Sequence, residues 1–310
     1  MKKILLGMVI YSILAVLVIP FLVTLCCNGL GKEVEKHAER LYGVEDLAEL
    51  AEQHGMGTEL EEYVVGVVAA EMPAAFPLEA LKAQAVAART YQIQQQKAAD
   101  SAEILYDVGQ AYCTIEEQKA KWGESYTVHS EKVRQAVRET TGEIMVYDGE
   151  PILAAFHAQS GGKTEDAENV WSSALPYLKS VDSAEDKNAP HHKTTVQLPA
   201  KEVLSALCGE TSDMDIVILS RTEAGTVAEV QAGKTILTGR EVRERLGLRS
   251  ANFTISREGD TFLFTTYGYG HGAGMSQYGA SFLAEQGKSY REILKHYYTG
   301  IAFQKIKPEV

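Results

Sequence analysis

The sequence predicts an α+β fold, in which a helical region packs on a mixed, mainly antiparallel sheet region with a groove between them, plus one N-terminal transmembrane helix. Three observations favour this class. Residues 4–27 carry no charge, two helix signals follow each other between residues 60 and 97, and short strand signals separated by glycine-containing turns recur from residue 143 onward. Runs of helices followed by runs of strands are typical of an α+β domain.

The uncharged N-terminal run follows Lys2 and Lys3 and is long enough to cross a bilayer as a helix. A cleavable signal peptide is the competing interpretation, but no small-x-small cleavage site follows Val18. The two lysines predict that residues 1–3 are a cytoplasmic tail. We therefore expect a signal anchor at 4–27, a juxtamembrane helix or linker at 28–58, and an extracytoplasmic catalytic domain at 59–310.

Composition narrows the class of partner. The chain has 310 residues, a formal charge of −12 and an isoelectric point near 5.2, which argues against a nucleic acid held by a basic surface. Cys113 and Cys208 are the only cysteines beyond the apolar N-terminal run. Their spacing does not indicate a disulfide, and we expect two isolated thiols.

The two helix signals surround a pair of prolines. The stretch 60–72 is almost wholly apolar, and Pro73 disfavours helical backbone just before it. Pro77 suits the first turn of a second helix, which we expect to end near residue 97. The apolar positions of this second helix recur at helical spacing: Leu78, Leu81, Ala85 and Ala88.

Glu71 is the only charged residue between Tyr63 and Met72. Burial and the negative end of a helix dipole both raise a carboxyl pKa, which a general acid near neutral pH requires. The alternative is a structural carboxylate at a helix end, paired for example with Arg89. The pattern alone leaves both interpretations open.

The middle of the chain changes from helix to strand. Residues 100–122 show no clear period and predict a loop with short pieces of structure, and 130–141 predict a helix that ends at Gly142. Segments 143–147 and 151–157 then predict a hairpin around Asp148-Gly149. The second strand leads to His157 and on to Ser160, before two glycines that permit close approach of a ligand or simply form a turn.

A third strand is expected at 177–181, which would place Tyr177 and Lys179 on one face. An aromatic ring beside an ammonium group suits a sugar, because the ring stacks and the ammonium donates hydrogen bonds. A solvated lysine beside a half-buried tyrosine is the simpler alternative.

Residues 193–250 contain no chemical motif and predict an accessory α/β subdomain. Its expected elements are strands at 194–198, 216–221 and 227–231 and helices at 201–207 and 238–246. Another hairpin is expected from strands 253–257 and 261–267.

A glycine-rich segment at 267–280 places four glycines around His271, before a helix that is expected to run to about Glu285. Its spacing matches neither nucleotide-binding motif. His271 is either a ligand-facing group or a histidine in a structural turn. A capping box at Ser289 begins the last helix, and 301–306 predict a closing strand.

At these segments the sequence resembles the stage II sporulation protein D family, which also includes amidase-enhancer proteins of the bacterial cell wall. The resemblance covers nearly everything from about Glu59 to the C-terminus, in the family's order. Four blocks carry it: 60–91, with Glu71-Met-Pro and Ala-Arg89-Thr-Tyr; 156–164, Phe-His-Ala-Gln-Ser-Gly-Gly-Lys-Thr; 176–179, Pro-Tyr-Leu-Lys; and 270–280, Gly-His-Gly-Ala-Gly-Met-Ser-Gln-Tyr-Gly-Ala.

The resemblance implies a lytic transglycosylase that cleaves the β-1,4 bond between N-acetylmuramic acid and N-acetylglucosamine in peptide-stripped glycan and leaves 1,6-anhydro ends. Glu71 would be the acid and base. The remaining site residues would position the sugars or stabilise an oxocarbenium-like state: Arg89, His157, Ser160, Tyr177, Lys179, His271, Ser276 and Gln277.

The resemblance also implies a setting. The chain would lie in the mother-cell membrane facing the septal wall, with a cell-wall amidase and a polytopic membrane protein of the engulfment machinery as partners. Some members carry a Cys/His metal cluster in the loop that corresponds to 100–122. Here that loop has Cys113 and no histidine before His129, so we expect no metal and no cofactor.

Three other functions are compatible with the residues. A non-catalytic glycan-binding enhancer of an amidase would need the groove but not an ionisable Glu71. A serine hydrolase would use Ser276 and His271, which lack an obvious acidic partner in sequence. A metal-dependent hydrolase would use His157, His191 and His271, whose spacing matches no known ligand pattern.

Overall fold

The computed structural model describes residues 59–101, 109–171, 173–209 and 214–306, which belong to one compact unit that begins at Thr58. The expected cytoplasmic tail, signal anchor and juxtamembrane segment lie outside the described residues. Within the described part, no helix combines the length and apolarity that a bilayer span requires. The predicted α+β class is confirmed for this part of the chain.

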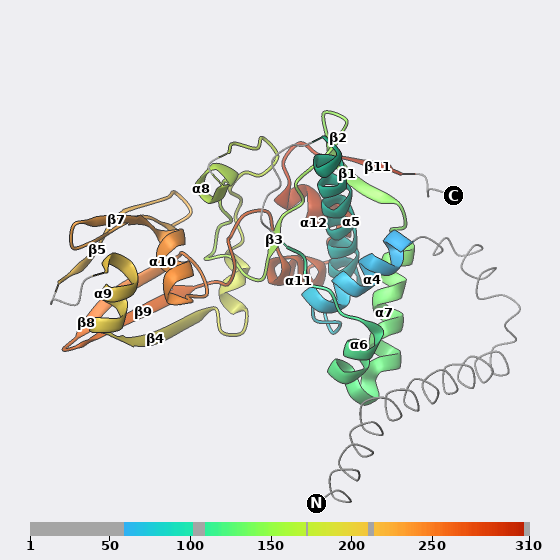
Figure 1. The fold of residues 1–310 in the computed structure, drawn as a ribbon. Coiled ribbons are helices and arrows are strands. Elements are labelled where there is room, and N and C mark those ends of the chain that lie inside the picture. The colour runs from blue at the N-terminus through green and yellow to red at the C-terminus, as the bar shows by residue number, and fades with distance from the viewer. Residues whose placement is uncertain (1–58, 102–108, 172, 210–213, 307–310) are drawn as a thin grey trace, which may run out of the picture. The chain divides into compact units, whose positions relative to one another are not determined.

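A helical core forms around α5 (Leu78–Ser101), which contacts α4 (Glu59–Glu71), α7 (Tyr126–Glu139), α11 (Gln277–Glu285) and α12 (Tyr290–Tyr297) (Figure 1). Small side chains let these helices approach closely. Among the described side chains of α4 and α5, ten alanines and valines are fully buried: Val64, Val67, Val68, Ala69, Ala80, Ala83, Ala85, Val86, Ala87 and Ala88. Helix α4 ends at Glu71 and α5 begins at Leu78, which confirms the predicted break at Pro73 and restart at Pro77.

Arg89 lies in this core and not in a groove. Its side chain is fully buried, and its Nε and Nη2 donate to the two carboxylate oxygens of Glu61 at 2.8 and 2.6 Å. Its Nη1 donates to the backbone carbonyl of Glu143 at 3.0 Å. Arg89 thus joins α5 to α4 and to the strand that follows α7, and it does not pair with Glu71.

Two small sheets border the helices. One has the order β11 (Ala302–Lys305), β1 (Glu143–Tyr147), β2 (Glu150–Pro151), with antiparallel pairing throughout. The other pairs β3 (Phe156–His157) in parallel with β10 (Met275–Ser276), in a register that places His157 opposite Ser276. The second sheet joins two of the predicted motifs.

The predicted second strand of the hairpin, 151–157, is only partly correct. The Asp-Gly turn forms, with φ of 50° at Asp148 and 85° at Gly149. Ile152 N–H still donates to the Met145 carbonyl of β1 at 3.2 Å, and beyond Ile152 the chain leaves this strand. Leu153 N–H donates to the Tyr177 hydroxyl at 3.1 Å instead of to a neighbouring strand.

Residues 193–267 build a second core of their own (Figure 1). One sheet has the order β4 (Lys193–Pro199), β9 (Thr261–Tyr267), β8 (Phe253–Glu258). The other has the order β5 (Ile216–Arg221), β6 (Val227–Ala232), β7 (Thr235–Thr238). Helices α9 (Ala200–Cys208) and α10 (Gly239–Leu246) pack with them. The accessory subdomain thus includes the hairpin after residue 250, because β9 pairs with β4.

For the connecting segments, the predicted loop with short pieces of structure at 100–122 is confirmed in part, and the predicted strand at 177–181 is wrong. Residues 115–122 form a helix, α6 (Ile115–Trp122), which a capping box from Thr114 to Glu117 begins. Residues 177–181 are not a strand, because Thr164 and Val181 bond each other through backbone and hydroxyl groups and a turn holds Leu178. The remaining short helices are η2 (Gly123–Ser125), α8 (Ala167–Trp171) and η3 (Ala184–Asn188). Cys113 and Cys208 are free thiols, as expected.

Candidate active site

Glu71 is the last residue of α4 and is half-buried. Its Oε1 accepts a hydrogen bond from the Ala111 backbone N–H at 2.6 Å, and its Oε2 lies 3.5 Å from Nε2 of Gln277. Burial raises the pKa of Glu71, while the Ala111 N–H, Gln277 and the charge of Lys121 act in the opposite direction. The net shift is upward, so burial dominates and the acid form persists to higher pH than in a free glutamate.

The end of α4 is capped from α6. Lys121 Nζ donates to the carbonyls of Ala69 and Ala70 at 2.8 and 3.2 Å. These carbonyls form the negative end of the helix, so the ammonium group both satisfies them and offsets their effect on the neighbouring carboxyl. Lys121 was not predicted, because nothing in a charged, surface-type segment indicates which lysine bonds a helix end 51 and 52 residues earlier.

Replacing Lys121 with Met should raise the pKa of Glu71 further. The change removes a positive charge beside the carboxyl and leaves the α4 carbonyls without this donor, and both effects disfavour the carboxylate. The measurement is a ¹³C NMR titration of the Glu71 carboxyl. Lys119→Met, on the same helix with its ammonium group over Tyr126, should leave the titration unchanged. A pKa that falls in the Lys121 variant would contradict this account.

Gln277 connects Glu71 to the glycine-rich segment. It is the first residue of α11, directly after β10, and its Nε2 also lies 3.4 Å from Oε1 of Gln84 on α5. Gly274 lets this segment approach β3, because its φ is +73° and a Cβ there would lie 2.0 Å from the Ala155 carbonyl. The predicted residues Glu71 and Gln277 are therefore brought together.

His157 and His271 form a second group. Their ring centroids are 5.7 Å apart, and the Trp171 ring lies 5.1 Å from that of His271. Nδ1 of His157 contacts the Ala273 carbonyl at 3.1 Å and must donate to it, whereas Nδ1 of His271 accepts from the Ala273 N–H at 3.1 Å. One residue therefore fixes opposite tautomers, with a bare Nε2 on His157 and an Nε2–H on His271.

Both imidazoles remain neutral at physiological pH. Burial lowers the pKa of His157 to about 4 and, together with the neighbouring His157, lowers that of His271 to about 3. An imidazole that carries its proton on Nε2 does not offer that atom to a metal. Within the described ranges no three His, Cys, Asp or Glu side chains are grouped to hold a metal ion, and His191 lies in an exposed turn.

Ser160 and Ser276 meet at a buried aspartate. Asp186 is fully buried in η3 and accepts from the Ser160 backbone N–H at 2.7 Å and from the Ser276 hydroxyl at 3.0 Å. Ser276 also accepts from Gly279 N–H and so caps α11. In the described structure the hydroxyl thus contacts an acid and no histidine, which disfavours the serine-hydrolase alternative. Asp186 was missed because it stands in a polar run that reads as a solvated loop.

Tyr177 and Lys179 were expected on one face of a strand, but each makes separate contacts of its own. The Tyr177 hydroxyl accepts from Leu153 N–H, and its ring lies 5.6 Å from that of Tyr147. Lys179 Nζ lies 3.1 Å from both oxygens of Glu168 and 3.9 Å from Asp166. The place of Tyr177 and Lys179 in a substrate site stays a prediction.

Glu165 is a buried carboxyl that sequence analysis did not select. It is 2% exposed, and its Oε1 accepts from Thr222 in the turn between β5 and β6 at 3.0 Å. Its Oε2 has no hydrogen-bond partner among the described residues. Burial raises the pKa of Glu165 to about 7. This carboxyl therefore connects the segment after the Gly-Gly turn with the accessory subdomain and changes charge near neutrality.

The pKa of Glu165 predicts a pH-dependent stability. The folded chain binds this proton more tightly than the unfolded chain, so the stabilisation is complete below about pH 4.5 and is lost as the pH rises through 7, a difference of about 3 kcal/mol. Glu165→Gln, which mimics the protonated form, should match wild type at pH 5 and unfold at higher urea at pH 8. Equal midpoints at pH 8 would contradict the prediction, and Glu168→Gln on the surface is the control.

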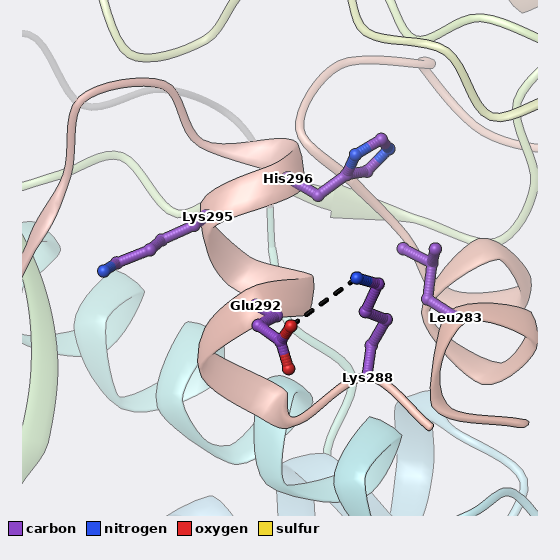
Figure 2. Close-up of a pocket in the computed structure, with 5 residues that line it drawn as sticks. All are labelled: Leu283, Lys288, Glu292, Lys295 and His296. Carbon is purple, nitrogen blue, oxygen red and sulfur yellow. Dashed lines mark ion pairs between the residues drawn. The ribbon is translucent and has the colours of Figure 1, made fainter. Parts of the chain in front are cut away.

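The pocket in Figure 2 lies elsewhere, between α11 and α12. It has a volume of about 310 Å³, and Lys288 approaches Glu292 at 3.5 Å across it. Its lining residues are Leu283, Lys288, Glu292, Lys295 and His296. None of them was predicted as a site residue, and none carries the acid chemistry found at Glu71.

Comparison of the sequence with known proteins points to one family. A family model described as Stage II sporulation protein matches residues 54–147, which include Glu71 and Lys121. The chain is 45% identical over 251 residues to stage II sporulation protein D of Bacillus amyloliquefaciens, covering 78% of this chain and 73% of that protein. It is 45% identical over 250 residues to the Bacillus subtilis protein of the same name, with the same coverage.

A more distant relative has a different name. The amidase enhancer of Bacillus subtilis is 29% identical over 291 residues, covering 76% of this chain and 39% of that protein. The level of identity to the sporulation proteins, together with their coverage, shows the family. The chain belongs to the stage II sporulation protein D family.

Proposed function

We propose that this chain is a membrane-anchored peptidoglycan lytic transglycosylase with Glu71 as its single acid and base. The observation that carries the proposal is the environment of Glu71, a half-buried carboxyl with a raised pKa at a helix end. Among the described residues, the groups within hydrogen-bond reach of it are a backbone N–H and an amide side chain. Ordinary glycoside hydrolysis uses two carboxyl groups, whereas a transglycosylase needs one.

The proposed reaction begins with protonated Glu71. The acid gives its proton to the glycosidic oxygen as the bond from C1 of N-acetylmuramic acid to that oxygen breaks. The resulting carboxylate then takes the proton from the C6 hydroxyl of the same sugar, whose oxygen closes on C1. The products are a 1,6-anhydro end and a free 4-hydroxyl, Glu71 is protonated again, and no water is consumed.

The upward pKa shift serves the first step, because an acid must still hold its proton near neutral pH. The Ala111 N–H serves the second, because a donor to Oε1 stabilises the carboxylate that forms after proton transfer. Gln277 would hold Oε2 toward the substrate. The Nε2 atoms of His157 and His271 are buried, so a part for these rings in sugar binding stays a prediction from the resemblance.

The family supports a role in sporulation, and the amidase-enhancer relative supports a connection with a cell-wall amidase. We place the enzyme in the mother-cell membrane, with residues 1–3 in the cytoplasm and the domain from 59 onward facing the septal wall. It would act there in septal wall degradation and engulfment, on strands that the amidase has stripped of peptides, beside a polytopic membrane protein of the engulfment machinery.

The test is the chemistry of the products. The full chain is incubated with peptide-free glycan strands, and the ends are identified by mass spectrometry. Anhydro-muramoyl ends support the proposal. Reducing ends would replace it with a hydrolase that has a second carboxyl.

A second candidate is a glycan-binding enhancer of an amidase, which the name of the 29% identical relative favours. Retained glycan binding without cleavage, together with faster release of stem peptides by an added amidase, would support it over the transglycosylase.

A further inference from the structure

Tyr112 is a large aromatic side chain on the surface beside Glu71. It is 50% exposed and directly follows Ala111, whose N–H bonds the Glu71 carboxyl at 2.6 Å. The inner side of the ring lies on α4, where it stacks on Tyr63 with centroids 5.7 Å apart and planes 12° from parallel. The segment that bonds the proposed acid therefore presents a part-exposed, flat aromatic ring to solvent.

The ring is held in place from beneath and from both sides. A Cβ at Gly66 would lie 2.2 Å from the Tyr112 ring, so the glycine in the apolar run of α4 provides the space for it. Cys113 N–H donates to the Gly66 carbonyl at 3.1 Å on one side, and Ala111 bonds Glu71 on the other. Gln110 Nε2, in the same segment, donates to the Ala88 carbonyl of α5 at 3.4 Å. The ring is therefore fixed before any ligand arrives, which lowers the entropy cost of binding.

Glu71 thus has a rigid aromatic surface next to it. Tyr112 directly follows Ala111, whose N–H bonds the Glu71 carboxyl, and Tyr63 lies on the same helix as Glu71. A pyranose ring presents C–H groups on its face, and a flat aromatic ring buries such a face without demanding a hydrogen bond. The exposed polar groups of the sugar can remain in water or contact neighbouring residues.

We propose that Tyr112 is a sugar-stacking residue, which binds the pyranose ring adjacent to the glycosidic bond that faces Glu71. This inference rests on the proposed function in its choice of a glycan as ligand, but it does not require cleavage. Tyr112 has no part in proton transfer. It sets the position of the strand along α4 and therefore contributes to KM more than to kcat.

The first experiment measures binding in the Glu71→Gln chain, so that no turnover occurs. The probe is a peptide-free oligosaccharide of alternating N-acetylglucosamine and N-acetylmuramic acid, and the readout is isothermal titration calorimetry. Tyr112→Ala should weaken binding about tenfold, which corresponds to about 1.4 kcal/mol of lost stacking. Tyr112→Phe should stay within about twofold of its parent, because stacking needs the ring and not the hydroxyl. Ile236→Ala, an exposed apolar residue of β7, is the control and should bind normally.

The second experiment separates stacking from a structural role. In the Glu71 background, ¹³C titration of the carboxyl should give the same pKa in Tyr112→Ala as in wild type, because the Ala111 N–H stays in place. Gly66→Ala, which forces the ring off the helix, should weaken binding and shift that pKa together. A shifted pKa in Tyr112→Ala, or undiminished glycan binding, would overturn the proposal.

The outcomes distinguish the two proposals. Weaker binding in Tyr112→Ala with no cleavage by wild type would remove the transglycosylase and keep the stacking residue. Cleavage by wild type with unchanged binding in Tyr112→Ala would keep the enzyme and remove the stacking residue. A Tyr112→Ala chain that binds the glycan normally but loses binding to a partner protein would also overturn the inference.

Discussion

Glu71→Gln is expected to lower the rate of anhydro-end formation about 10²–10⁴-fold while glycan binding is retained. The amide keeps the size of the side chain and an oxygen for the Ala111 N–H, but it has no proton to give to the glycosidic oxygen. Folding should not suffer, since burial already disfavours the charged form of this carboxyl. The measurement is the rate of release of anhydro-muramoyl products, with binding measured in parallel.

The control for Glu71 is another glutamate of the same helix. Glu62 lies on the surface of α4 in a pair with Arg134, with Oε1 to Nη1 at 2.8 Å. Glu62→Gln removes the same charge from the same helix and should leave the rate unchanged. A Glu71→Gln chain that cleaves at the wild-type rate would transfer the acid role to another residue.

Arg89→Met is expected to destabilise the domain by about 3–5 kcal/mol. The change leaves Glu61, which is 3% exposed, as a buried carboxylate without its bidentate partner, and removes a donor from the Glu143 carbonyl. Among the residues that the structure describes, Gly142 N–H is the one donor left to Glu61, at 3.1 Å. Urea denaturation followed by tryptophan fluorescence measures the loss.

Two comparisons make this prediction specific. Arg134→Met breaks an ion pair to the same helix at the surface and should cost about 1 kcal/mol or less. Adding Glu61→Gln to Arg89→Met should recover part of the stability, because the uncompensated charge is gone. Activity per folded molecule should stay near wild type. If it falls sharply while stability holds, Arg89 acts on the substrate, as the resemblance implied.

The helical half of the fold could be predicted from the sequence for a physical reason. Pro73 and Pro77 dictate where helices stop and start, whatever the tertiary context, and the small apolar residues between them fit one buried face. The strand at 177–181 failed because its alternation of side chains is equally compatible with a turn. Thr164 bonds this segment through its backbone and hydroxyl, and that long-range partner is invisible to a local pattern.

The candidate site divides in the same way. The position of Glu71 at the end of α4 could be predicted, because Pro73 stops the helix just after it, whereas its role as an acid stays a proposal. Arg89 was placed in the site by resemblance, but its partner Glu61 lies 28 positions away in sequence and identifies it as a core residue only once the helices are packed. Lys121, Asp186 and the backbone of Ala111 act through contacts between distant segments. A backbone N–H in particular has no residue type that would reveal it.

Ala273 has a consequence for how the two histidines can vary. The Ala273 carbonyl accepts from Nδ1 of His157, and the Ala273 N–H donates to Nδ1 of His271. The backbone of this one residue, and not a side chain, therefore determines that Nε2 of His157 is an acceptor and Nε2 of His271 is a donor. The side chain at this position takes no part in either hydrogen bond, but Ala273 is fully buried, so the position admits only a small residue. Proline lacks the N–H, and it would free His271 to reverse its tautomer while His157 kept its own. The asymmetry of the pair therefore depends on one small, buried residue with an intact N–H.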